Sequence, residues 1–152
     1  MDAMEIGLRH RLRRALRQME GQHRHLKPIY AELVRAVDGS AASEMREWLS
    51  RYREALEAHF ALEEEVLFPA LRGLHPQRVG DLDRLSDDHQ RFQAKLLEIE
   101  GALLTACGHD NAGRIAAFRD SLEDHERREE RLVVQLLDVS SEHASEDRDR
   151  GV

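Results

Sequence analysis

With 152 residues, 41% hydrophobic and 35% charged, but only nine Gly and three Pro, the chain suits one domain of long amphipathic helices and disfavours an all-β fold. The formal net charge of −7 disfavours nucleic acid as a partner, and no uncharged stretch is long enough to cross a membrane. Because the start of the chain lacks a signal-peptide pattern and the one cysteine, Cys107, cannot form an internal disulfide, we expect a cytoplasmic protein.

Apolar residues recur at steps of three and four, which predicts four amphipathic helices, over residues 12–37, 45–70, 82–103 and 115–136. Pro28 lies inside the first segment and should bend that helix. The short connections predict an all-α, up-down-up-down four-helix bundle over residues 1–138. Residues 139–152 are polar and charged without an apolar period, so we expect a disordered tail there. The arginine-rich segment 9–17 is interpreted as a solvated helix face, with a docking patch as the alternative.

Six ionisable residues occupy positions in these helices where the apolar period calls for a core side chain. Burying one such group without a partner costs several kcal/mol, and six would exceed the net stability of a typical domain, roughly 5–15 kcal/mol. They must therefore pair with one another or bind something. The six are His23, His59, Glu63, His89, His125 and Glu129.

Two further patterns connect these residues. At about 1.5 Å per helical residue, antiparallel packing places the four histidines at nearly one level along the bundle. The chain also repeats itself, since each half supplies one lone histidine and one His-x-x-x-Glu pair. Corresponding members are 66 residues apart: His23 and His89, His59 and His125, Glu63 and Glu129. These patterns together predict a symmetric pair of metal ions, with a metal-free helical scaffold as the alternative.

Imidazole and carboxylate ligands suit iron, zinc or manganese. Zinc prefers four ligands per ion, whereas this set leaves each ion unsaturated. The set works best if Glu63 and Glu129 bridge both ions, leaving room for an oxo or hydroxo bridge and an external ligand. We therefore favour two non-haem iron ions over zinc or manganese. Tyr30 and Tyr52, seven residues from two of the histidines, are interpreted as core aromatics, with hydrogen bonding to a bound ligand as the alternative.

The run His59-Phe-Ala-Leu-Glu-Glu-Glu-Val-Leu-Phe-Pro-Ala-Leu, with His89 in Asp-Asp-His-Gln-Arg-Phe and His125 in His-Glu-Arg-Arg-Glu-Glu, resembles the hemerythrin-like (HHE cation-binding) family. The likeness spans about residues 5–138. It implies a non-haem di-iron centre that handles O₂, NO, peroxide or labile iron. His23 and His59 would then bind one iron and His89 and His125 the other.

Oxygen-carrying members of this family place a further histidine one turn before the third-helix ligand, where this chain has Leu85. The resemblance therefore favours bacterial members linked to NO, oxidative stress and iron–sulfur repair over reversible oxygen carriage. Two functions stay open. The di-iron centre binds or senses a small ligand, or it is a redox enzyme that turns over peroxide or NO with electrons from a partner.

Overall fold

This computed structural model describes residues 2–39, 42–103 and 108–149, and only the backbone at residues 108–109 and 138–149. Cys107 lies outside the described residues. Every regular element in the described part is helical. In chain order the elements are α1 (Ala3–Gly39), α2 (Ala42–Leu62), the π-helical segment η1 (Glu63–Leu67), α3 (Phe68–Leu74), the short 3-10 helix η2 (Pro76–Arg78), α4 (Val79–Leu103) and α5 (Gly108–Asp149).

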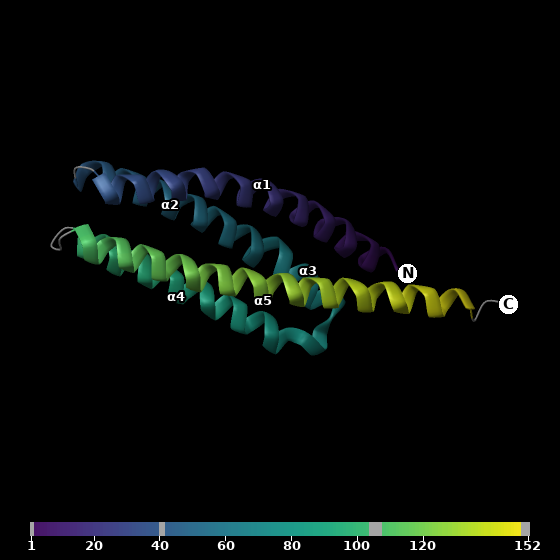
Figure 1. The fold of residues 1–152 in the computed structure, drawn as a ribbon. Helices are drawn as coiled ribbons and strands as arrows, with labels where there is room; N and C mark the ends of the chain where they lie inside the picture. The colour runs from purple at the N-terminus through teal and green to yellow at the C-terminus, as the bar shows by residue number, and fades with distance from the viewer. Residues whose placement is uncertain (1, 40–41, 104–107, 150–152) are drawn as a thin grey trace.

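Four rods form the bundle: α1, the combined α2–η1–α3 rod, α4 and α5 (Figure 1). Each packs against two others, because α1 contacts α2 and α5, and α4 contacts the same two helices. The start of α1 and the end of α5 lie at the same end of the bundle, as an up-down-up-down order requires (Figure 1). The predicted four-helix bundle is confirmed. No helix in the described part of the chain could cross a membrane.

The interior is divided into two apolar cores. One core lies toward the α1–α2 turn and includes Leu33, Leu49, Leu56, Leu96 and Phe118. The other lies toward the opposite end and includes Leu12, Leu67, Phe68, Leu82 and Leu136. In every rod, residues of one core come before the predicted ligands and residues of the other core come after them. The six ionisable residues therefore form a polar layer between two apolar blocks.

The structure differs from the sequence prediction in the second helix, which is not continuous. Its backbone widens to a π-helix at Glu63–Leu67, where the Phe68 amide donates to the Glu63 carbonyl oxygen five residues back. Pro69 follows at once in the first turn of α3. Proline lacks an N–H and its ring crowds the carbonyl four residues earlier, so a widened turn here relieves a clash that a regular helix would suffer.

α1 continues as one helix through Pro28, in agreement with the single helix predicted over residues 12–37, and the bend expected at Pro28 stays a prediction. One further difference concerns a helix end. α5 extends to Asp149, into the segment 139–152 for which we expected disorder. The residues from Ser140 to Asp149 contain neither Gly nor Pro, so nothing in their backbone chemistry stops a helix that is already formed. In the segment 9–17, the outward arginines are largely exposed while Leu12 and Ala15 are buried, in agreement with a solvated helix face.

Candidate metal centre

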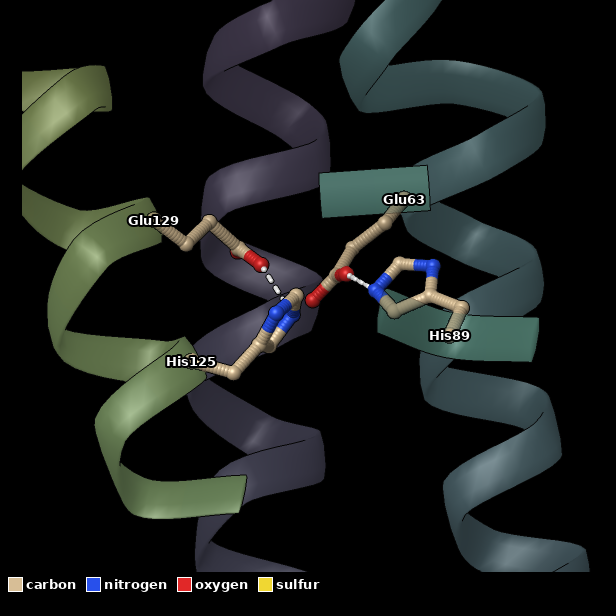
Figure 2. Close-up of side chains that lie close together, drawn as sticks. All are labelled: Glu63, His89, His125 and Glu129. Atoms are coloured by element: carbon tan, nitrogen blue, oxygen red, sulfur yellow. Dashed lines mark ion pairs between the residues drawn. The ribbon is translucent and has the colours of Figure 1, made fainter. Parts of the chain in front are cut away.

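Four of the six predicted ligands converge in the middle of the bundle. Glu63 begins η1, His89 lies on α4, and His125 and Glu129 lie one turn apart on α5. All four are buried, with relative exposures between 1 and 4%. One ligand atom from each lies within 4.8 Å of the others. Figure 2 shows the four side chains pointing toward one another from three different rods. They form the inner cluster.

The other two predicted ligands, His23 on α1 and His59 on α2, meet beside this cluster. Their Nε2 atoms are 3.1 Å apart. A carboxylate that the sequence prediction did not include, Glu126 on α5, lies 3.9 Å from the His23 Nε2. His23, His59 and Glu126 also bring their ligand atoms within 4.8 Å of one another. This second group, the outer cluster, is half-exposed at His23 and Glu126 and buried at His59.

Glu63 joins the two clusters. Its Oε1 lies 2.7 Å from the His59 Nε2, and its Oε2 lies 2.7 Å from the His89 Nε2. One carboxylate thus reaches one histidine of each cluster, which is the arrangement a bridging ligand needs. Glu129 lies nearer the inner cluster, with its Oε2 3.4 Å from the His125 Nε2. The predicted division of the histidines into His23 with His59 and His89 with His125 agrees with this geometry.

The pKa shifts in the layer show that burial disfavours the charged form of both carboxylates when no cation compensates it. Burial raises the pKa of Glu129 to about 7, helped by the nearby charge of Glu63. Burial acts in the same direction on Glu63, but hydrogen bonds to His59 and His89 outweigh it and lower the Glu63 pKa. Burial also lowers the pKa of His23, together with the charge of His59. At His59 itself, burial is outweighed by the hydrogen bond to Glu63, and the pKa rises. The groups therefore share protons where cations would otherwise compensate their charge.

Three histidines are oriented from behind by an oxygen acceptor. The Nδ1 of His59 donates to Gln22 Oε1 at 3.0 Å, that of His89 to Glu64 Oε1 at 2.7 Å, and that of His125 to Asp88 Oδ2 at 2.9 Å. Because an oxygen acceptor requires the proton on Nδ1, the Nε2 lone pair of each neutral ring points into the layer. Metal-binding histidines in proteins are commonly held this way.

These supporting residues were missed from sequence, although the repeat contains a signal for two of them. Gln22 and Asp88 directly precede the lone histidines and are themselves 66 residues apart. Each accepts from a histidine 37 residues further along the chain. Asp88 is 2% exposed and also pairs with Arg91 and Arg128. A polar residue beside a core histidine in both halves was the available signal.

The third supporting residue depends on η1. In a regular helix, consecutive residues point about 100° apart, so Glu63 and Glu64 could not both face the layer closely. The π-turn alters this spacing locally: Glu63 is buried between His59 and His89, while Glu64 reaches His89 from behind and accepts from the Ser86 hydroxyl at 2.9 Å. A π-turn produces no recognisable spacing of apolar residues, so it could not be predicted from the apolar pattern of the sequence.

The inner cluster has the chemistry of a cation site. Five of its buried side-chain atoms lie within ion-pair distance of a partner in the layer but have no hydrogen bond with good geometry: both Glu63 oxygens, Glu129 Oε2, and the Nε2 atoms of His89 and His125. Buried polar atoms in native proteins are nearly always satisfied, so such a concentration needs an explanation. All five are lone-pair donors aimed at one place. Imidazole nitrogen with carboxylate oxygen suits iron, zinc or manganese, so the residues fit a bound metal.

Comparison with known proteins agrees with this geometry. A profile of the hemerythrin HHE cation-binding domain matches residues 14–146. The chain belongs to the hemerythrin HHE family. The match covers all four rods and all six residues of the polar layer, so this HHE domain is a cation-binding domain, and the family resemblance seen in the sequence is confirmed.

One curated relative is a DNA nickase from Nostoc sp. (strain PCC 7120 / SAG 25.82 / UTEX 2576), 25% identical over 126 residues. The alignment covers 82% of the present chain and 34% of the nickase, so the HHE chain spans about a third of that protein's length. No solved structure matches the chain significantly.

The two halves of the HHE domain are unequal around their histidines. Phe60 stacks on His89, with ring centroids 4.2 Å apart, and Phe92 meets His125 edge-on. Around His23, by contrast, a cavity of about 260 Å³ opens, lined among others by Tyr30, Tyr52 and Arg119. The inner cluster is therefore covered by apolar rings, whereas the outer cluster is accessible from a polar cavity.

Proposed function

We propose that this HHE domain holds two non-haem iron ions and uses them to bind a small ligand such as O₂, NO or peroxide. His23 and His59 would hold one iron, His89 and His125 the other, with Glu63 and Glu129 shared between them. The observation that carries this proposal is the polar layer itself: buried imidazole and carboxylate atoms, five of them without a hydrogen bond of good geometry, that converge between two apolar cores. When bound, the iron pair would supply reversible one-electron redox chemistry and open coordination positions.

The chain's own residues account for the rest of the function. Gln22, Glu64 and Asp88 hold three imidazoles with Nε2 inward, which keeps the ligand set in place whether or not metal is bound. Phe60 and Phe92 pack their rings against the two histidines of the inner cluster. The cavity beside His23 gives a diatomic or triatomic ligand a way in, and burial raises the Tyr52 pKa well above its usual value, so its hydroxyl stays a hydrogen-bond donor there.

Leu85 supports a ligand set with four histidines. It stands where oxygen-carrying relatives would have a further histidine, and it is 5% exposed within an apolar core. Its repeat counterpart Met19 lies in the same core. We therefore favour NO or peroxide over reversible oxygen carriage. Cleavage of nucleic acid is not part of the proposal, because the formal net charge of −7 opposes a polyanionic substrate.

The test uses the full chain loaded with iron under anaerobic conditions. Absorption and paramagnetic-resonance spectra are recorded in the reduced state and after addition of O₂, NO or hydrogen peroxide. The proposal expects saturable spectral changes with at least one of them. Sustained consumption of NO or peroxide in the presence of an added reductant would identify the alternative redox enzyme. Spectra that do not respond to any of the three would contradict both functions.

A further inference from the structure

Glu126 departs from the internal repeat at the point where the two clusters differ most. Its counterpart 66 residues earlier is Phe60, the ring that stacks on His89 in the inner cluster. In the outer cluster the same position carries a carboxylate. The chain thus has an acid beside His23 and His59 where Phe60, the corresponding residue of the first half, would predict an apolar cover.

The contacts of Glu126 direct it to the outer cluster. Among the described residues, it forms an ion pair with His23, whose Nε2 lies 3.9 Å from the Glu126 Oε1. Arg119, which lines the same cavity as Glu126, bonds instead to Glu123 at 2.8 Å and lies over the Tyr30 ring. The Glu126 side chain is 33% exposed, so the protein covers it substantially, and no arginine or lysine of the described part of the chain forms an ion pair with it.

Glu126 also lies at the entrance to this cluster. It lines the cavity of about 260 Å³ together with His23 and Tyr52, and it lines a second cavity of about 560 Å³ together with Met19 and Glu129. His23 and Glu123 also line both cavities. A small molecule that approaches the outer cluster from either cavity therefore meets Glu126 beside His23.

We propose that Glu126 is a seventh protein ligand, bound to the metal held by His23 and His59, where it competes with small external ligands. This inference rests on the proposed function, because it presupposes a metal at the outer cluster. It makes the two metals chemically distinct. The inner one would be held by buried groups only, and the outer one would carry a carboxylate that lies at the protein surface and can be displaced.

The test substitutes the carboxylate by its uncharged isostere, Glu126→Gln. Glu130→Gln is the matched control, because Glu130 lies one turn further along α5, lines the larger of the two cavities with His23 and is exposed. The full chain is loaded with cobalt(II), whose visible absorption responds to the number and type of its ligands. Metal content, chelator competition, the cobalt spectrum and azide titration are measured for the wild type and both variants.

We expect the wild type and Glu130→Gln to bind two cobalt ions with the same spectrum. Glu126→Gln should hold one of the two ions at least tenfold more weakly, change the cobalt spectrum, and bind azide more tightly than the wild type as long as the outer metal is present. Glu126→Phe, which restores the symmetry of the repeat, should weaken the same metal while keeping the helical circular dichroism signal.

Two results would overturn the inference. One is a Glu126→Gln protein whose cobalt spectrum and affinities match the wild type. The other is an equal change in Glu130→Gln, which would indicate a general effect of charge rather than ligation. A wild-type chain that binds fewer than two ions would instead contradict the paired centre, so the failure of the inference and of the proposed function can be told apart.

Discussion

At the residue scale, the orientation of each imidazole is set by a partner outside the layer. Asp88 is the clearest case, since it is buried and accepts from the His125 Nδ1 at 2.9 Å. A carboxylate in this place both fixes the ring and increases the electron donation from Nε2. Residues of this kind influence metal affinity without contacting the metal.

Asp88→Asn should therefore lower the affinity for metal by about 10–100-fold while leaving all six predicted ligands in place. The matched control is Asp87→Asn, because Asp87 is adjacent in sequence and exposed, and should bind metal like the wild type. Competition with a chromophoric chelator measures both affinities. Equal affinities in the two variants would show that the hydrogen bond to His125 has no influence on the centre.

The raised pKa of Glu129 leads to a prediction of how pH affects the stability of the metal-free protein. Its pKa is about 7 in the folded chain against an ordinary value of 4.5, because burial disfavours its charge. With its carboxyl pKa raised, the contribution of Glu129 to the free energy of unfolding is largest below about pH 4.5, falls between that pH and about 7, and is absent above it. The shift corresponds to roughly 3 kcal/mol. The raised His59 pKa acts in the same direction, since its stabilisation is also lost as pH increases.

Glu129→Gln has no charge to bury, so the metal-free variant should lose less stability than the wild type between pH 5 and pH 8. Chemical denaturation of chelator-treated protein at the two pH values measures this difference. Glu130→Gln, which changes an exposed carboxylate on the same helix, should keep the wild-type pH dependence. Parallel pH profiles for the wild type and Glu129→Gln would contradict the burial argument.

What the sequence could predict at this scale follows from chemistry. A histidine on an apolar stripe is conspicuous, because its neighbours at steps of three and four are Leu, Met or Phe. His23, His59, His89 and His125 could all be found in this way, and the 66-residue repeat added Glu63 and Glu129. Glu126 could not, because it lies at the edge of the stripe on a helix rich in acids, where a carboxylate usually faces solvent.

At the element scale, the two proline-containing helices differ in how they accommodate proline. Pro28 is exposed within α1, where it removes the hydrogen bond to the Arg24 carbonyl, and the helix nevertheless continues. Pro69 follows η1 in the first turn of α3, where proline's missing N–H costs little. The pattern of apolar residues located both helices but could not predict the π-turn, which changes local spacing by one residue and leaves the period intact on either side.

Pro28→Ala should stabilise the protein by about 1–3 kcal/mol, because alanine restores the hydrogen bond and has the higher helix propensity. Pro69→Ala is the comparison, and a gain well below that of Pro28→Ala is expected. Urea denaturation of metal-loaded protein gives both values. A destabilised Pro28→Ala protein would mean that the packing of α1 requires the proline at this position.

At the scale of the whole molecule, the polar layer lies between two apolar cores and receives side chains from all four rods. Cations bound there would connect rods that are otherwise held by apolar packing on either side. A ligand that binds only the folded state stabilises it by an amount that grows with its concentration, about 4 kcal/mol at a thousand times Kd. The same layer without cations contains buried carboxylates that share protons with histidines. Metal binding and fold stability are therefore coupled in this protein.

The metal content of the purified chain tests the central claim most directly. Elemental analysis of the wild type should give two metal ions per chain, as should His25→Ala, whose histidine is exposed on α1. Glu63→Ala should retain at most one, because Glu63 reaches both His59 and His89. A wild-type protein with one ion or none after loading with iron, or a Glu63→Ala protein that still holds two, would contradict the account.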